Sequence, residues 1–87
     1  METLDLDTAI DEMYRVLKPH MSEGERYWVE EGVKVGEPYS SFLMLVSYAV
    51  KFEPHLARKY FPLLEEEDSE EYENKLVENE RKLSRGH

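Results

Sequence analysis

The sequence predicts an all-α fold, a small bundle of four to five helices with an apolar central helix and an acidic C-terminal helix. Two observations lead to this prediction. Apolar residues recur at intervals of three and four, which places them on one face of a helix. Capping residues and prolines mark where these segments begin and end. The chain of 87 residues is expected to form one domain, with residues 1–64 as a helical core and residues 65–87 as the acidic helix of that same domain.

The first helix is expected over residues 8–18. One face of this segment carries apolar side chains at the i, i+3, i+4, i+7 spacing: Ile10, Met13, Tyr14 and Leu17. Asp7 or Thr8 is the expected N-cap. Pro19 ends the helix, because the residue before a proline is disfavoured in helical geometry.

A second helix is expected over residues 23–35. Ser22 and Glu25 have the spacing of a capping box, in which each side chain bonds the backbone N–H of the other residue. Gly32 and three valines weaken the helical pattern, so a short hairpin through residues 30–34 is the alternative.

The third helix is expected to open at Glu37 and Pro38, since proline is favoured in a first helical turn. Over residues 42–52, apolar side chains point in almost every direction around the helix axis. A helix that is apolar on all sides is usually surrounded by protein, so this segment is the expected centre of the core. A shorter helix is expected over residues 55–61, between Pro54 and Pro62.

Acidic residues dominate the last segment. Residues 65–80 contain nine acids and one base, and residues 81–87 contain three bases. This order complements the helix dipole, so a helix is expected over residues 68–83, capped by Asp68 or Ser69. Its narrow apolar stripe consists of Tyr72, Leu76, Asn79 and Leu83. The stripe fits a heptad seam for a coiled-coil pair, or it docks onto the central helix, which needs no partner and is preferred.

The charge balance argues against nucleic acid as a partner. The chain has 20 acidic and 11 basic side chains and a formal net charge of −9. Binding to phosphates requires clustered lysines and arginines, whereas the field of this chain repels polyanions. The partner class that this charge favours is a basic protein.

No site for chemistry is expected. The chain has no cysteine, which removes thiolate metal sites, disulfides and cysteine nucleophiles. The three histidines, at positions 20, 55 and 87, lack the spacing of metal ligands. Neither a nucleophile elbow nor a phosphate-binding loop is present. We therefore expect no metal, no cofactor and no enzymatic activity.

The termini and the apolar stretches predict a cytoplasmic protein without membrane contact. The N-terminus is acidic where a signal peptide would be basic. The longest nearly apolar stretch, residues 42–50, is shorter than the roughly 20 residues needed to span a membrane.

Together these features predict a small acidic helical module that binds a basic protein, as an inhibitor, immunity-type or adaptor protein. In length, acidity and expected helix content the chain is similar to the colicin-type nuclease immunity proteins and to acidic proteins that imitate nucleic acid. This is a similarity of composition, and no residue role is carried over from it. The expected aromatic contacts and acidic contacts are Trp28, Tyr72, Glu66, Glu67, Glu70 and Glu73. The alternative is a structural subunit that forms a homodimer or larger homo-oligomer through its apolar or C-terminal helix.

Overall fold

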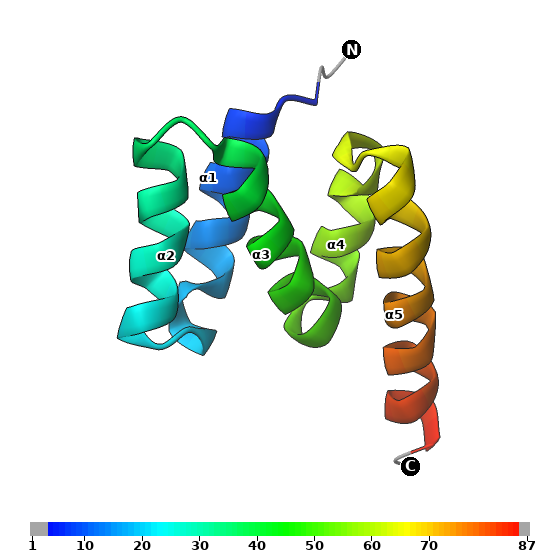
Figure 1. The fold of residues 1–87 in the computed structure, drawn as a ribbon. Helices are drawn as coiled ribbons and strands as arrows, with labels where there is room; N and C mark the ends of the chain where they lie inside the picture. The colour runs from blue at the N-terminus through cyan, green and yellow to red at the C-terminus, as the bar shows by residue number, and fades with distance from the viewer. Residues whose placement is uncertain (1–3, 86–87) are drawn as a thin grey trace.

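A computed structural model describes residues 4–85, and its side chains as far as residue 82. This part of the chain contains five α-helices and no strand, which confirms the all-α prediction. The helices are α1 (Leu6–Leu17), α2 (Glu23–Lys34), α3 (Pro38–Phe52), α4 (Pro54–Tyr60) and α5 (Glu66–Arg85), with two short 3-10 helices at Lys18–His20 and Phe61–Leu63. Figure 1 shows their order in space.

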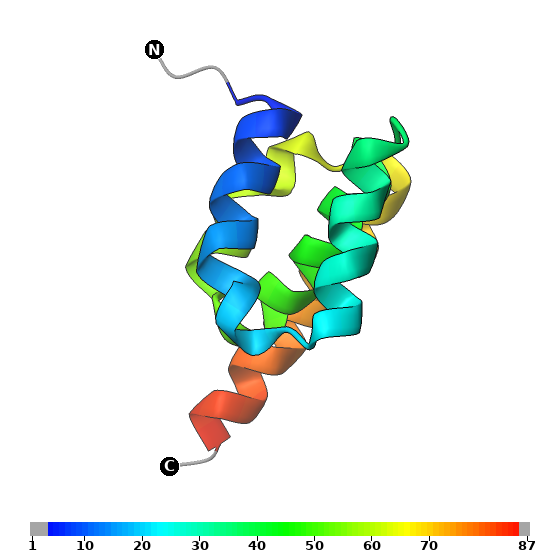
Figure 2. The ribbon, with the colours of Figure 1, turned by 90° about the vertical axis from the view of Figure 1, so that its left-hand side faces the viewer.

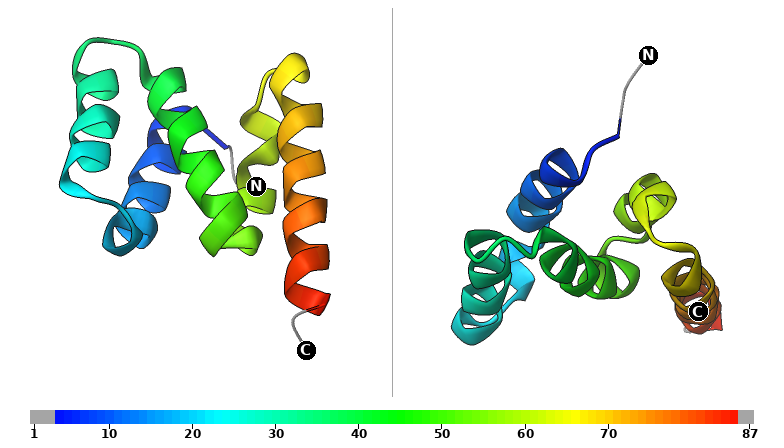
Figure 3. Two further views of the ribbon diagram at one scale, coloured as in Figure 1. Left: turned by 60° about the horizontal axis from the view of Figure 1, so that its bottom comes forward. Right: turned by 45° about the horizontal axis from the view of Figure 1, so that its top comes forward.

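Helix α3 lies in the middle of the molecule, as its all-round apolar pattern predicted. It packs against α1 and α2 on one side and against α4 and α5 on the other (Figures 1 and 3). Its buried residues are Ser41, Phe42, Leu45, Val46, Ala49 and Val50. Helix α3 contacts every other helix. Helices α1 and α2 form one flank of the molecule, and helices α4 and α5 form the other.

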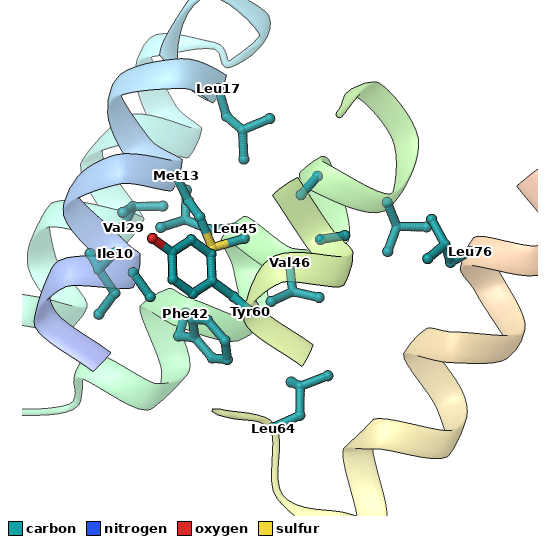
Figure 4. Close-up of a cluster of buried hydrophobic side chains, with 14 of the residues drawn as sticks. Ile10, Met13, Leu17, Val29, Phe42, Leu45, Val46, Tyr60, Leu64 and Leu76 are labelled. Atoms are coloured by element: carbon teal, nitrogen blue, oxygen red, sulfur yellow. The ribbon is translucent and has the colours of Figure 1, made fainter. Parts of the chain in front are cut away.

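All five helices contribute to one hydrophobic core. Its largest fully buried side chains include Met13 from α1, Phe42 from α3 and Tyr60 from α4. Figure 4 shows these three side chains close to one another, with Leu76 of α5 reaching the same cluster from the other flank. Leu76 is only 1% exposed, so α5 is packed onto the core along this part of its length.

The start of α1 differs from the prediction. The N-cap is Asp5, and not Asp7 or Thr8, so the helix begins at Leu6. The Asp5 carboxylate accepts hydrogen bonds from the Thr8 backbone N–H and the Thr8 hydroxyl, each at 2.8 Å. These bonds lower the pKa of Asp5. The earlier start also places Leu6 one turn before Ile10, and both side chains contact the core.

Helix α2 begins as predicted, with the Ser22–Glu25 capping box. Glu25 N–H donates to Ser22 Oγ at 3.2 Å, and Ser22 N–H donates to Glu25 Oε1 at 2.7 Å. The helix continues to Lys34, so the hairpin alternative is wrong. Gly36, with φ of 82°, then reverses the chain in a left-handed conformation that glycine adopts without strain.

Gly32 is explained by the packing of α2 on α3. A Cβ atom at this position would overlap Ser41 Oγ, so only glycine permits the observed approach. Ser41 is itself held in place, because its hydroxyl donates to the Val29 carbonyl oxygen at 2.6 Å. The glycine that weakened the helix prediction is therefore a helix–helix contact point.

The last two helices begin earlier than expected. Helix α4 starts at Pro54, and the chain continues past its end into a 3-10 helix that contains Pro62. Helix α5 starts at Glu66, so the predicted cap at Asp68 or Ser69 is wrong. The hydroxyl of Tyr39, on α3, caps this end instead. It accepts from the Glu65 N–H and donates to Asp68 Oδ2, each at 2.8 Å.

Candidate protein-interaction surface

Most of the tyrosines join helices to one another. Four of the six donate the hydroxyl hydrogen to a carboxylate on a different helix. These bonds run from Tyr14 to Glu30, from Tyr39 to Asp68, from Tyr48 to Glu25 and from Tyr60 to Glu12. The high tyrosine content, which suggested an interaction surface, is therefore largely structural.

The electrostatics of these groups reflect that structural role. Burial, together with the neighbouring carboxylate, raises the pKa of Tyr14 and of Tyr39 to about 12. The same two causes raise the pKa of Tyr60. Hydrogen bonds from Lys59 and then from Tyr60 lower the pKa of Glu12, whose carboxylate lies 2.8 Å from Lys59 Nζ. Each shift follows from a contact between helices.

The predicted stripe on α5 docks onto α3. Tyr72 is half-buried against the core, with its hydroxyl oxygen 3.3 Å from Ser47 Oγ. Asn79 Nδ2 donates to the carbonyl oxygens of Val50 at 2.9 Å and Lys51 at 3.4 Å, which lie in the last turn of α3. The preferred docking prediction is therefore confirmed for Tyr72, Leu76 and Asn79, while the side chain of Leu83 lies outside the described residues.

The four acids predicted to bind a partner lie on the outer side of α5. Glu66, Glu67, Glu70 and Glu73 are all exposed. None of them has an ion pair with a side chain that the structure describes. Other acids of α5 form ion pairs: the Glu71 carboxylate lies 3.2 Å from Lys75 Nζ, and Glu80 pairs with Arg58.

Trp28 is far from those acids. It lies on α2, 62% exposed, with the ring of Tyr27 packed edge-on at a centroid distance of 5.3 Å. Helices α2 and α5 are on opposite sides of α3 (Figures 1 and 3). The structure therefore does not unite the predicted site residues. It places Trp28 on one flank and the four acids on the other, with Tyr72 turned toward α3.

The exposed apolar residues gather on α2. Seven large hydrophobic side chains are exposed in the described part of the chain, and four of them belong to α2 or to its C-cap. They are Tyr27 (56% exposed), Trp28 (62%), Val33 (45%) and Val35 (58%). Val33 lies on the side of α2 next to α1. We call the other three residues, Tyr27, Trp28 and Val35, the α2 patch. A groove of about 250 Å³ borders it on the α3 side, lined in part by Trp28, Val35 and Met44.

A second groove, between α1 and α2, is absent from the sequence predictions. It has a volume of about 400 Å³ and is lined by Asp7, Ile10, Asp11, Tyr14, Val29, Glu30 and Val33. Figure 2 shows the two helices side by side, with α3 behind them. The only sequence signal was the four-residue spacing of Asp7 and Asp11 and of Val29 and Val33, which places each pair on one helix face.

Two further features of residues 4–85 concern metal binding and membranes. Among residues 4–85, no three His, Cys, Asp or Glu side chains are grouped so as to hold a metal ion. No helix in this range combines the length and the apolar character that a membrane span requires. No protein-family model matches the chain, and neither a curated protein nor a solved structure shows significant similarity to it. Function is therefore inferred from the surface of the molecule.

Proposed function

We propose that the protein is a non-enzymatic cytoplasmic module that binds a basic protein, as an inhibitor, immunity-type or adaptor protein. The observation that carries this proposal is the α2 patch, which exposes the only tryptophan and two further large side chains, Tyr27 and Val35, on a strongly acidic molecule. Exposed aromatic residues of this kind are enriched among the residues that contribute most to binding at protein interfaces. Contiguous exposed apolar surface on a small protein also marks interaction sites.

The acidic residues around the patch favour a basic partner. Glu31 and Glu37 line the same groove as Trp28 and Val35. Charges close to an interface select partners of opposite charge and fix their orientation. An apolar centre with a charged surround is the usual arrangement of a specific interface.

The acids of α5 have a different role in this proposal. Glu66, Glu67, Glu70 and Glu73 lie across α3 from the α2 patch. The Debye length is about 8 Å at physiological ionic strength, so charges on the far flank act weakly at the patch. Their contribution is to the long-range field that attracts a cationic partner before contact.

A pull-down with the full chain tests the proposal. Wild-type protein should recover a basic protein from a lysate of the native host, with less recovered as salt is raised. Trp28→Ala should lose most of this recovery, because the tryptophan supplies apolar contact area. The matched control is Val77→Ala on α5, at a side chain 51% exposed, and it should recover the partner as wild type does. The proposal fails if no basic protein is recovered, or if Trp28→Ala recovers as much as the control.

The homo-oligomer alternative has less support. It depends on the apolar helix or on the stripe of the C-terminal helix. The buried side chains of α3 pack against the other four helices, and Tyr72, Leu76 and Asn79 contact α3 within the same chain. Sedimentation equilibrium should therefore give the mass of a monomer, and a stable dimer would favour the alternative instead.

A further inference from the structure

We propose that the groove between α1 and α2 is the docking site for an amphipathic basic helix of the partner. Apolar side chains of that helix enter the groove, and its lysines or arginines pair with the carboxylates on either side. This inference rests on the proposed function, because it assigns a second contact with the same partner, on the α1 side of α2, and the chemistry that is recognised there.

The groove results from the way in which α1 and α2 are held. Each packs against α3, whereas direct packing between α1 and α2 is sparse. Between the groove walls, the Tyr14 hydroxyl on α1 donates to the Glu30 carboxylate on α2. The space between the two helices is therefore a feature of the fold, present before any partner binds. Its volume of about 400 Å³ lies within the range of about 300–1,000 Å³ that is typical of ligand sites.

The floor of the groove suits an apolar side chain. Ile10 and Val29 form part of it and are 8% and 1% exposed, so they belong to the core. Val33 lies one turn after Val29 and is 45% exposed, which leaves apolar surface in contact with water. Covering that surface is favourable, and helices that dock in grooves do so with apolar residues at spacings of three and four.

The rim of the groove suits a cation. Asp7 and Asp11 are four residues apart on α1, both exposed, and neither has an ion pair with a described side chain. Glu30 stands on the opposite wall. A helix lying along the groove would meet carboxylates on both sides, so basic residues that flank its apolar face would be paired.

A second copy of this chain is a poorer occupant than a basic partner. Each copy carries a net charge of −9, so two copies repel one another at long range. The described basic residues nearest the C-terminus, Arg81 and Lys82, lie on α5, whose preceding turns are strongly acidic. The groove therefore favours a separate protein whose docking helix carries net positive charge.

A designed peptide provides the probe. It is a helical peptide with leucines along one face at spacings of three and four and lysines flanking that face. Titrated into 15N-labelled full-length protein at physiological salt, it should shift the backbone amides of residues 7–14 and 29–33. A peptide of equal charge, with the leucines replaced by serines, should bind at least about tenfold more weakly. Equal binding of the two peptides, shifts centred on α5, or no shifts up to about 1 mM peptide would overturn the inference.

A matched pair of variants locates the site. Val33→Lys places a base across the groove at an exposed position, and should weaken binding of the leucine peptide by at least about tenfold. Val77→Lys makes the same change at the comparably exposed valine of α5, and should leave the affinity within about twofold of wild type. Melting curves of both variants should match that of the wild-type protein.

Two outcomes separate the groove from the proposed function. If Val33→Lys still captures the basic partner as wild type does while Trp28→Ala does not, the groove is excluded and the α2 patch remains the interface. If the wild type sediments as a dimer and Val33→Lys as a monomer, a second copy occupies the groove and the inference is wrong. Failure of the proposed function has a different signature, since no basic protein is then recovered by any variant.

Discussion

Single residues set the distances between the helices of this bundle. Gly32 allows α2 to approach α3, where Ser41 is fixed by its bond to the Val29 carbonyl oxygen. Sequence patterns gave no indication of this contact. A glycine within a helical segment lowers the helix propensity of that segment, so it counts against a predicted helix. The surface that Gly32 contacts lies on another helix, so the neighbouring residues do not reveal it. The N-cap at Asp5 was also not predictable from sequence patterns, because Asp5 and Asp7 are equally suitable N-caps by residue type.

Gly32→Ala is expected to destabilise the protein. The added methyl group meets Ser41 Oγ, so the helices must separate or the Ser41 hydrogen bond must break. The expected loss is about 1–3 kcal/mol in the free energy of unfolding, the usual cost of overpacking. Urea denaturation measures it.

Gly24→Ala is the matched control for this change. Gly24 lies in the first turn of the same helix, with nothing within 4 Å of an added Cβ. Alanine is a better helix former than glycine, so the free energy of unfolding should stay the same or rise by up to about 1 kcal/mol. Equal losses in the two variants would show that the Gly32 contact is unimportant.

At the scale of helices, the position of an element was more predictable than the contacts that hold it. The central place of α3 followed from its composition, and the start of α2 followed from the local Ser22–Glu25 pair. The contact of Tyr39 with the start of α5 could not be predicted from a local pattern, because Tyr39 lies 26 residues before Glu65 in the sequence. The groove was missed for the same reason, since it depends on how two helices are spaced by a third.

The tyrosine contacts between helices predict a loss of stability in alkali. Tyrosine ordinarily titrates near pH 10.0, whereas the pKa values of Tyr14 and Tyr39 are raised to about 12 in the folded protein. The folded state therefore keeps protons that the unfolded state loses between these values. The free energy of unfolding should hold up to about pH 10 and fall as the pH rises toward 12.

Urea denaturation across this pH range is the measurement, with two tyrosine variants for comparison. Tyr39→Phe removes one of the raised groups, so its stability should fall less steeply with pH than that of the wild type. Tyr60→Phe removes another group whose pKa is raised, so its stability should also fall less steeply with pH than that of the wild type. A wild-type free energy of unfolding that stays constant between pH 10 and 12 would contradict the assignment of these contacts.

At the scale of the whole molecule, charge is divided between two flanks. Residues 1–37 carry a net charge of −6 and residues 65–80 a net charge of −8, whereas residues 38–64 carry +2. In the fold, residues 38–64 supply the central helix α3 and the short helix α4, and the two acidic segments lie to either side. The acidity was evident from composition, but its separation into two surfaces depends on the packing of the helices.

The acids of α5 are expected to affect how fast a partner arrives. Replacing Glu66, Glu67, Glu70 and Glu73 with Gln should slow association by about tenfold at low ionic strength, because the long-range field is weakened. The difference should shrink to about twofold or less at physiological salt. Stopped-flow measurements with the recovered partner report this rate.

A variant that keeps the net charge provides the comparison. Replacing both members of the Glu71–Lys75 pair with Gln removes one acid and one base from the same helix. Association of this variant should match the wild type at every salt concentration. An unchanged rate for the fourfold variant at low ionic strength would rule out a steering role for α5.

The fluorescence of Trp28 tests the central claim most directly, because it is the only tryptophan in the chain and is 62% exposed. In the free protein its emission should be that of a tryptophan in water and should be readily quenched by acrylamide. Saturation with the basic partner, in a form without tryptophan, should shift the emission to shorter wavelength and protect it from quenching. Unchanged emission and quenching in the saturated complex would contradict the claim that the α2 patch is the binding surface.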